Sequence, residues 1–175
     1  MQKLQGQWDM IKLAFGCSHT YGLGVERNEA WPFLLDAINL GKSGVSVNYI
    51  ARILPSCVES YKPSLIYILW PDYTRFEYEE NGIIHQSLPT DKNRIKFMEM
   101  ANDEWLWKNY NQQVDYIKSY CISHKIKLID MTLLDLAPFI DFADKWPLSK
   151  LGHHYSEEWH KWVADIFASK QNEQV

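Results

Sequence analysis

The run from Ser64 to Trp70 limits what this chain can fold into more than any other part of the sequence. Its residues, Ser-Leu-Ile-Tyr-Ile-Leu-Trp, form a continuous apolar stretch that is bounded by Pro63 and Pro71. Such a stretch predicts a strand that is buried on both faces, as in the middle of a parallel sheet. Parallel strands are joined by helical crossovers, so helices are expected between this strand and its neighbours.

Strand-like and helix-like segments alternate along the rest of the chain. The further strands are predicted at 11–15, 39–40 and 126–129, and the helices at 29–38, 46–53, 103–121 and from Ser156 onward. At 46% hydrophobic residues, the chain can bury a sizeable core. We therefore predict an α/β fold with a single domain over residues 1–175, a three-layer α/β/α sandwich with a mainly parallel sheet.

Turn-forming residues predict where the loops and the ends of these segments lie. Residues 16–29 are expected to form a polar loop, Pro55 to stop the helix that precedes it, and Asp130 to end the last strand. The dipeptide Asn81-Gly82 predicts a hairpin over 76–84, outside the main sheet. The buried faces of the last two helices are expected to consist of Leu106, Tyr110, Val114, Ile117 and Cys121, and of Trp159, Trp162, Val163, Ile166 and Phe167.

The turn after the first strand has the composition of a nucleophile site. Gly16 follows the apolar run 11–15, and Ser18 comes two residues later. A glycine lets the chain turn without a Cβ clash and leaves the serine hydroxyl at the edge of the sheet, although Gly and Ser also form purely structural turns. Loops 16–18, 41–44 and 71–75 all follow predicted strands or turns at one edge of the sheet, where sites form in such folds.

Three segments resemble the sequence blocks of one hydrolase family. Residues 15–22, Phe-Gly-Cys-Ser-His-Thr-Tyr-Gly, followed by Trp31-Pro32, resemble the first block of the SGNH (GDSL-type) hydrolases. Residues 39–46, Asn-Leu-Gly-Lys-Ser-Gly-Val-Ser, resemble the second block, and residues 154–160, His-Tyr-Ser-Glu-Glu-Trp-His, resemble the fifth. The resemblance follows family order over the whole chain. It implies the flavodoxin-like SGNH hydrolase fold and an esterase activity without a cofactor.

The same resemblance assigns roles to individual residues. Ser18 would be the nucleophile, and His154 would accept its proton, because a free hydroxyl is a poor nucleophile at neutral pH. The backbone N–H groups of Ser18 and Gly44 would form the oxyanion hole. The implied reaction is cleavage of a carboxylic ester through an acyl-serine intermediate, with a small-molecule or carbohydrate ester, such as an acetyl ester on a sugar, as the binding partner.

The third block of the family, Gly-x-Asn-Asp, is only partly matched. At Leu69-Trp70-Pro71-Asp72, Asp72 matches the aspartate, but Pro71 stands where an asparagine side chain would donate to the oxyanion. Tyr73, Thr74 or Arg75 could supply the missing donor. Arg75 is preferred, because a guanidinium offers several donors and could also bind a substrate that carries a carboxylate.

The residue that should orient the histidine is also missing. The family places an aspartate three residues before the catalytic histidine, and here that position is Leu151. Asp144 or Asp141 could replace it, a backbone carbonyl could accept from the imidazole, or the site could be catalytically impaired. We favour a replacement and keep His153, next to His154, as a supporting candidate.

Other functions remain to be weighed against the esterase. Cys17 is an alternative nucleophile, but its neighbouring position should turn it into the core. His153, His154 and His160 lack the spacing of a zinc site, so no metal is expected and His160 is interpreted as a packing residue. The alternative function is a catalytically impaired module that binds a carbohydrate or a protein partner. A nucleotide-binding domain ranks last, because both glycine-rich phosphate motifs are missing.

The composition bears on partners and location. The net charge is −4, and no Lys/Arg cluster interleaved with aromatic residues predicts a nucleic-acid partner. No apolar run reaches the roughly 18 residues that span a bilayer, and residues 1–7 do not resemble a secretory signal, so no membrane partner is expected. The three widely spaced cysteines indicate reduced thiols and a cytoplasmic location.

Overall fold

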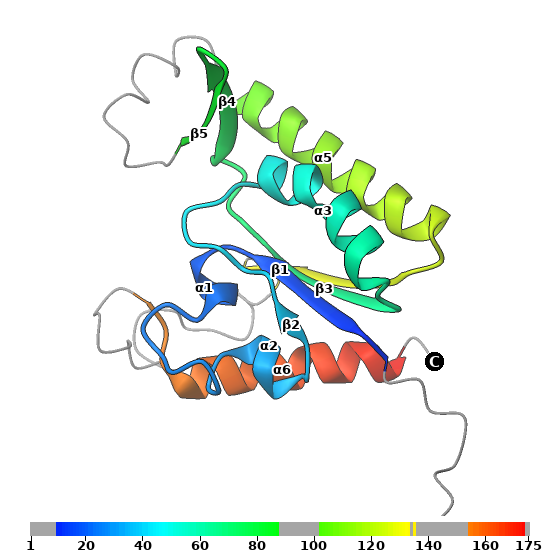
Figure 1. Ribbon diagram of the computed structural model, residues 1–175. Helices are drawn as coiled ribbons and strands as arrows, with labels where there is room; N and C mark the ends of the chain where they lie inside the picture. Colours follow the sequence, from blue (N-terminus) through cyan, green and yellow to red (C-terminus); the bar gives the residue numbers. More distant parts are fainter. Residues whose placement is uncertain (1–9, 88–101, 134, 136–153, 174–175) are drawn as a thin grey trace, which may run out of the picture.

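The main sheet contains four parallel strands in the order β2-β1-β3-β6. The computed structural model describes residues 10–87, 102–133, 135 and 154–173 (Figure 1). The strands of the main sheet are β1 (Lys12–Gly16), β2 (Ile38–Asn39), β3 (Leu65–Trp70) and β6 (Lys127–Thr132). From β1 the chain goes to β2 on one side and then crosses to β3 on the other side. The carboxyl end of β1 is therefore a topological switch point, the usual place of a site in such sheets.

Helices cover both faces of this sheet (Figure 1). On one face lie α3 (Val47–Tyr61) and α5 (Asp103–Ser123), and on the other lie α2 (Trp31–Leu34) and α6 (Glu157–Glu173). The predicted three-layer α/β/α sandwich with a mainly parallel sheet is thus confirmed. Among the described residues, no helix combines the length and apolar character needed to cross a membrane.

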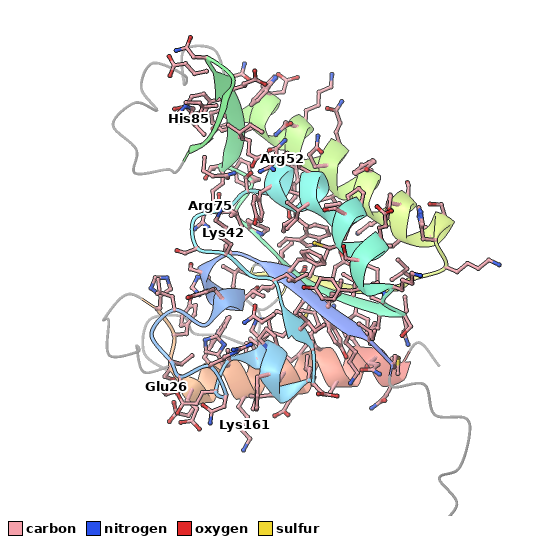
Figure 2. The ribbon with its side chains drawn as sticks, in the orientation of Figure 1. Glu26, Lys42, Arg52, Arg75, His85 and Lys161 are labelled. Carbon is pink, nitrogen blue, oxygen red and sulfur yellow. The ribbon has the colours of Figure 1, made fainter. Side chains whose placement is uncertain are left out.

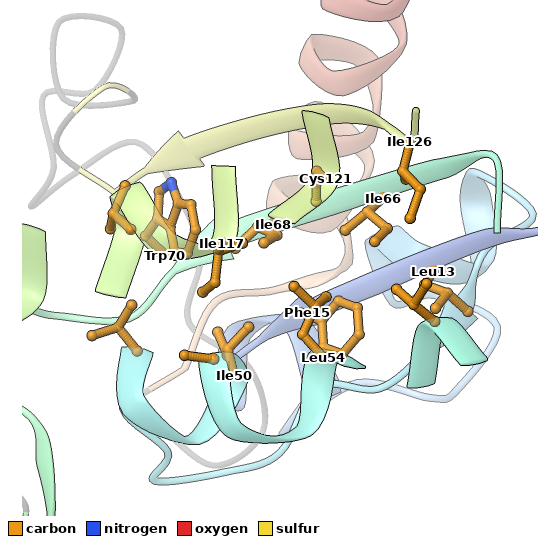
Figure 3. Packing of buried hydrophobic residues seen from close by; sticks show 14 of the residues in the cluster. Leu13, Phe15, Ile50, Leu54, Ile66, Ile68, Trp70, Ile117, Cys121 and Ile126 are labelled. Carbon is orange, nitrogen blue, oxygen red and sulfur yellow. The ribbon is translucent and has the colours of Figure 1, made fainter. Parts of the chain in front are cut away.

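Strand β3 is buried on both faces, as its sequence predicts. All six of its residues are at most 3% exposed. Ile66, Ile68 and Trp70 pack under α3 and α5 (Figure 3), whereas Leu65, Tyr67 and Leu69 pack against α6 and Trp31. Alternate residues of one strand therefore serve two separate cores, and this arrangement fixes the register of the central strands.

The prediction that Pro55 ends the helix after residue 46 is wrong. Helix α3 continues through Pro55 to Tyr61. A proline inside a helix costs about 3 kcal/mol. The buried face continues on both sides of it, with Leu54 fully buried and Val58 8% exposed. Burying each such side chain contributes about 1.5–3 kcal/mol, which offsets the lost hydrogen bond.

The helix predicted over 29–38 is much shorter than expected. Helix α2 has four residues, and Asp36 takes a left-handed conformation with φ 55°. This turn frees Ile38 to pair with Leu13 in β2, so the predicted strand at 39–40 begins one residue earlier. In this short helix Trp31 is fully buried, whereas Leu34 is 45% exposed.

The last strand of the main sheet also differs from its prediction. It runs past Asp130 to Thr132 and so is longer than the predicted 126–129. Asp130 fits inside the strand because its carboxylate accepts a hydrogen bond from Trp70 Nε1 at 2.7 Å and lies 3.1 Å from Lys118 Nζ. A paired carboxylate does not interrupt a strand in the way an unpaired buried one would.

The hairpin prediction is confirmed. Strands β4 (Phe76–Glu80) and β5 (Ile83–Ser87) form a separate antiparallel sheet. Asn81 and Gly82 have φ values of 53° and 76°, as the favoured two-residue turn requires. The expected buried face of α5 is confirmed; on α6, Trp159, Val163 and Phe167 are buried, while Trp162 and Ile166 are partly exposed.

Candidate active site

Gly16 makes the sharp turn at the end of β1. Its φ is 155°, and a Cβ atom there would lie 2.0 Å from Thr20 Oγ1 and 2.6 Å from the carbonyl oxygen of Leu69. Only glycine fits a backbone so close to the neighbouring strand. The segment predicted as a loop then begins with a helical turn, α1 (Ser18–Tyr21). Ser18 therefore stands at the carboxyl end of β1, at the switch point of the sheet.

The two candidate nucleophiles are both buried. Cys17, directly before α1, is 2% exposed and belongs to the core, which confirms the prediction that it turns inward. Ser18 is 6% exposed. Its carbonyl accepts hydrogen bonds from the N–H groups of Gly22 and Leu23, so its backbone is held in a fixed turn.

Asn39 holds the loop after β2 against α1. Its Nδ2 donates to the carbonyl of Thr20 at 2.9 Å, and its Oδ1 accepts from the Gly41 N–H at 2.9 Å. Gly41 packs so closely that a Cβ would lie 2.5 Å from the Tyr21 nitrogen. The loop continues to Gly44, the predicted oxyanion donor, which has a φ of 78°. Sequence reasoning missed Asn39, whose only signal is an amide at a strand end before Gly-Lys-Ser-Gly.

His154 reaches the residue next to Ser18. Its ring centroid lies 5.4 Å from that of His19, which also contacts Tyr155 and Trp159 at 5.1 Å and 5.5 Å. The fold thus brings the predicted fifth block to the predicted first block. The other candidates near the histidine, namely Asp141, Asp144, Leu151 and His153, lie outside the described residues.

The two other histidines near His154 are held neutral. Burial, together with repulsion by His154, Arg75 and His160, lowers the pKa of His19 to about 3. Burial and then repulsion by His154 lower the pKa of His160 to about 4. His160 is 1% exposed, and its Nδ1 accepts the Trp31 N–H at 3.3 Å, so its interpretation as a packing residue is confirmed. The sequence gives His19 no role of its own, but in the structure its ring contacts that of His154.

The loop after β3 carries Asp72 and Arg75. The exposed Asp72 accepts hydrogen bonds from the Thr74 N–H at 2.8 Å and the Thr74 hydroxyl at 2.5 Å, so its carboxylate stabilises the turn. Arg75 follows it, with its N–H bonded to the Asp72 carbonyl at 3.1 Å. The Nε and Nη1 atoms of Arg75 are buried and have no hydrogen-bond acceptor within the described part of the chain. Figure 2 shows Arg75 and Lys42 on the loops that follow β3 and β2.

Metal-binding side chains do not gather here. Over the described ranges, no group of three or more His, Cys, Asp or Glu residues has the arrangement to hold a metal ion. Cys17, Cys57 and Cys121 are free thiols. The described residues bring the imidazoles of His19 and His154 together, with the Arg75 guanidinium close enough to affect the pKa of His19.

Comparison with known proteins supports this fold and not a closer kinship. No protein-family model matches the chain, and no curated protein matches it in sequence. Among solved structures, it is similar to TesA, with a TM-score of 0.60 at 12% identity over 89% of this chain and 94% of TesA. It is also similar to the psychrotrophic esterase EstA from Pseudoalteromonas sp., with a TM-score of 0.51 at 14% identity over 95% and 98% of the two chains. The chain therefore shares its fold with these two solved structures.

Proposed function

We propose that the protein is a serine esterase of the SGNH type, which hydrolyses a carboxylic ester through an acyl-Ser18 intermediate. The observation that carries the proposal is the position of Ser18. It lies at the carboxyl end of β1, at the switch point of a fold shared with an esterase, and the His154 ring packs against the adjacent His19. In this class of fold, sites form at that edge.

The proposed reaction has two halves. His154 accepts the hydroxyl proton as Ser18 Oγ attacks the ester carbonyl, and the N–H groups of Ser18 and Gly44 stabilise the oxyanion. Collapse of the tetrahedral intermediate expels the alkoxide, which takes the proton from His154 and leaves as the alcohol. A water molecule then attacks the acyl-serine by the same route, releasing the carboxylic acid and restoring Ser18.

His19 is a poor candidate for the general base. A base whose pKa is about 3 binds a proton only weakly at neutral pH, and His19 has that value. Proton transfer is most effective when the pKa of the catalytic group is near the working pH. His19 is instead proposed to position His154 through ring contact. A carboxylate such as Asp144 or Asp141, or a backbone carbonyl, remains our proposal for the group that orients His154.

A fluorophosphonate probe tests the proposal directly, together with turnover of p-nitrophenyl acetate. We expect the wild type to be labelled and active, and Ser18→Ala to be neither. Cys17→Ala is the matched control, since it removes the neighbouring nucleophile and is expected to keep both labelling and turnover. The esterase proposal is refuted if labelling survives Ser18→Ala. It is also refuted if the wild type shows neither labelling nor turnover.

Pro71 favours a second candidate, a module that binds a carbohydrate or a protein partner without turnover. This buried residue has no N–H and no polar side chain, so the loop after β3 lacks the expected oxyanion donor at that position. Removing one such donor typically costs about 100- to 1,000-fold in rate. Binding of an ester without labelling of Ser18 would favour this module over the esterase.

A further inference from the structure

Arg75 lies beside the proposed nucleophile site. In the sheet, Leu69 of β3 is the register partner of Gly16 of β1, so the loops that follow these two strands leave the same edge side by side. Ser18 lies on one of these loops and Arg75 on the other. The positive charge of Arg75 also contributes to lowering the pKa of His19, so the guanidinium is within electrostatic reach of that ring.

The guanidinium of Arg75 has donors with nothing to bind. Its Nε and Nη1 are buried, and no acceptor for them exists among the residues that the structure describes. Arg52 provides the contrast within the same chain, because its Nε and Nη2 donate to the Glu77 carboxylate at 3.1 Å and 2.8 Å. Leaving a buried charged donor unsatisfied costs more than an ordinary hydrogen bond contributes, so an anionic acceptor would be bound strongly there.

The surrounding charges are positive as well. Lys42, on the loop after β2, lies 5.0 Å from the ring centre of Tyr49, and no ion pair of Lys42 or Arg75 occurs in the described ranges. The carboxylates nearest to Arg75 in sequence are Glu77, which pairs with Arg52, and Asp72, which accepts hydrogen bonds from Thr74. Within the described ranges, the positive charges of Arg75 and Lys42 at this edge of the sheet are therefore not held in ion pairs.

We propose that Arg75 binds a carboxylate of the substrate, so that the ester cleaved at Ser18 belongs to the hemiesters, which carry one free carboxylate. This substrate class rests on the proposed esterase function. The guanidinium binds carboxylates with a geometry that lysine does not reproduce. Bound in this way, the carboxylate would neutralise Arg75 and fix the distance between the ester carbonyl and the serine.

Two matched esters test this class. Monoethyl succinate carries a carboxylate, and ethyl succinamate replaces it with a neutral amide of the same size. We expect the wild type to prefer monoethyl succinate by about 10- to 100-fold in kcat/KM, mainly through KM, as a hydrogen bond to a charged group implies. Arg75→Met should bring the ratio of the two kcat/KM values close to one, and Arg75→Lys should restore part of it. Arg52→Met, which removes an arginine that already has its carboxylate, should leave the ratio unchanged.

Two results would refute the proposed carboxylate-binding role of Arg75 without refuting the esterase proposal. One is equal turnover of both esters by the wild type. The other is an Arg75→Met variant whose kcat falls by the same factor for both esters, which makes Arg75 an oxyanion donor. If neither ester is cleaved, the affinities of the Ser18→Ala variant for the two esters, measured by calorimetry, test the carboxylate site. Tighter binding of monoethyl succinate that Arg75→Met abolishes supports the carboxylate site, and equal affinities refute it. Absence of fluorophosphonate labelling refutes only the esterase.

Discussion

Replacing Gly16 by alanine tests the idea that the serine turn depends on close approach of two strands. The added Cβ would meet the side chain of Thr20, which can rotate away. It would also lie 2.6 Å from the carbonyl oxygen of Leu69, which cannot move in the same way. Leu69 lies in β3, between β1 and β6, and its backbone is fixed by both neighbours.

The expected cost has two parts. A φ of 155° is a region used almost only by glycine, and forcing another residue into it costs about 1–3 kcal/mol. Overpacking against a fixed backbone adds about 1–3 kcal/mol. We therefore expect Gly16→Ala to lower the free energy of unfolding by about 2–6 kcal/mol, a large part of the stability of a typical domain.

Gly82 provides a matched control. It also has a positive φ, 76°, but nothing lies within 4 Å of a Cβ placed there. Gly82→Ala should therefore show only the conformational cost, about 1–2 kcal/mol. Urea unfolding followed by tryptophan fluorescence measures both variants, and at a typical m-value the Gly16 variant should unfold about 1–2 M earlier than the Gly82 variant. Equal midpoints for the two variants would refute the argument from crowding.

Two further predictions concern the histidines and the loop after β2. Because burial lowers the pKa of His160 to about 4 and of His19 to about 3, both stay neutral in the folded protein while the unfolded chain binds protons near pH 6.5. The free energy of unfolding should be greatest above pH 6.5 and fall toward pH 4, by up to about 1.4 kcal/mol per pH unit for each histidine. In urea titrations between pH 7.5 and 5.5, His160→Gln should reduce this slope. His124→Gln, at an exposed position, should leave the slope unchanged. Asn39→Ala should lower kcat/KM for p-nitrophenyl acetate about 10-fold by releasing the loop after β2. Asn48→Ala, which breaks a part-buried bond between α3 and Asn109 of α5, should leave kcat/KM near the wild-type value. Equal losses in the two variants would contradict a positioning role for Asn39.

The parts of the fold that the sequence predicts are those with a strong local pattern. The apolar run of β3, the spacing of buried residues along α5 and the Asn81-Gly82 turn each specify one structure within a few residues of chain. The order of these segments then limits the topology, since parallel strands need crossovers. The family resemblance places Ser18, Gly44 and His154 in order, and of these the structure brings His154 to within ring contact of the neighbour of Ser18.

The parts of the structure that differ from the sequence-based prediction depend on tertiary contacts. Pro55 is a local signal to stop a helix, but burial of Leu54 and Val58 outweighs it. The turn at Asp36 appears only because β2 must pair with β1. The contact between His19 and His154 and the missing acceptor for Arg75 are likewise properties of loops that meet only after folding. No periodicity in the sequence encodes them.

The guanidinium of Arg75 affects which assay can test the esterase proposal. Its Nε and Nη1 are buried and have no acceptor among the described residues. On the hemiester proposal, a substrate carboxylate would supply that acceptor, whereas a neutral ester leaves the guanidinium without one and loses about 10- to 100-fold in kcat/KM. A low rate with p-nitrophenyl acetate is therefore expected of an active enzyme of this kind. It follows that covalent labelling of Ser18, whose product accumulates with time even when the reaction is slow, separates the esterase from the binding module better than turnover of a neutral ester does.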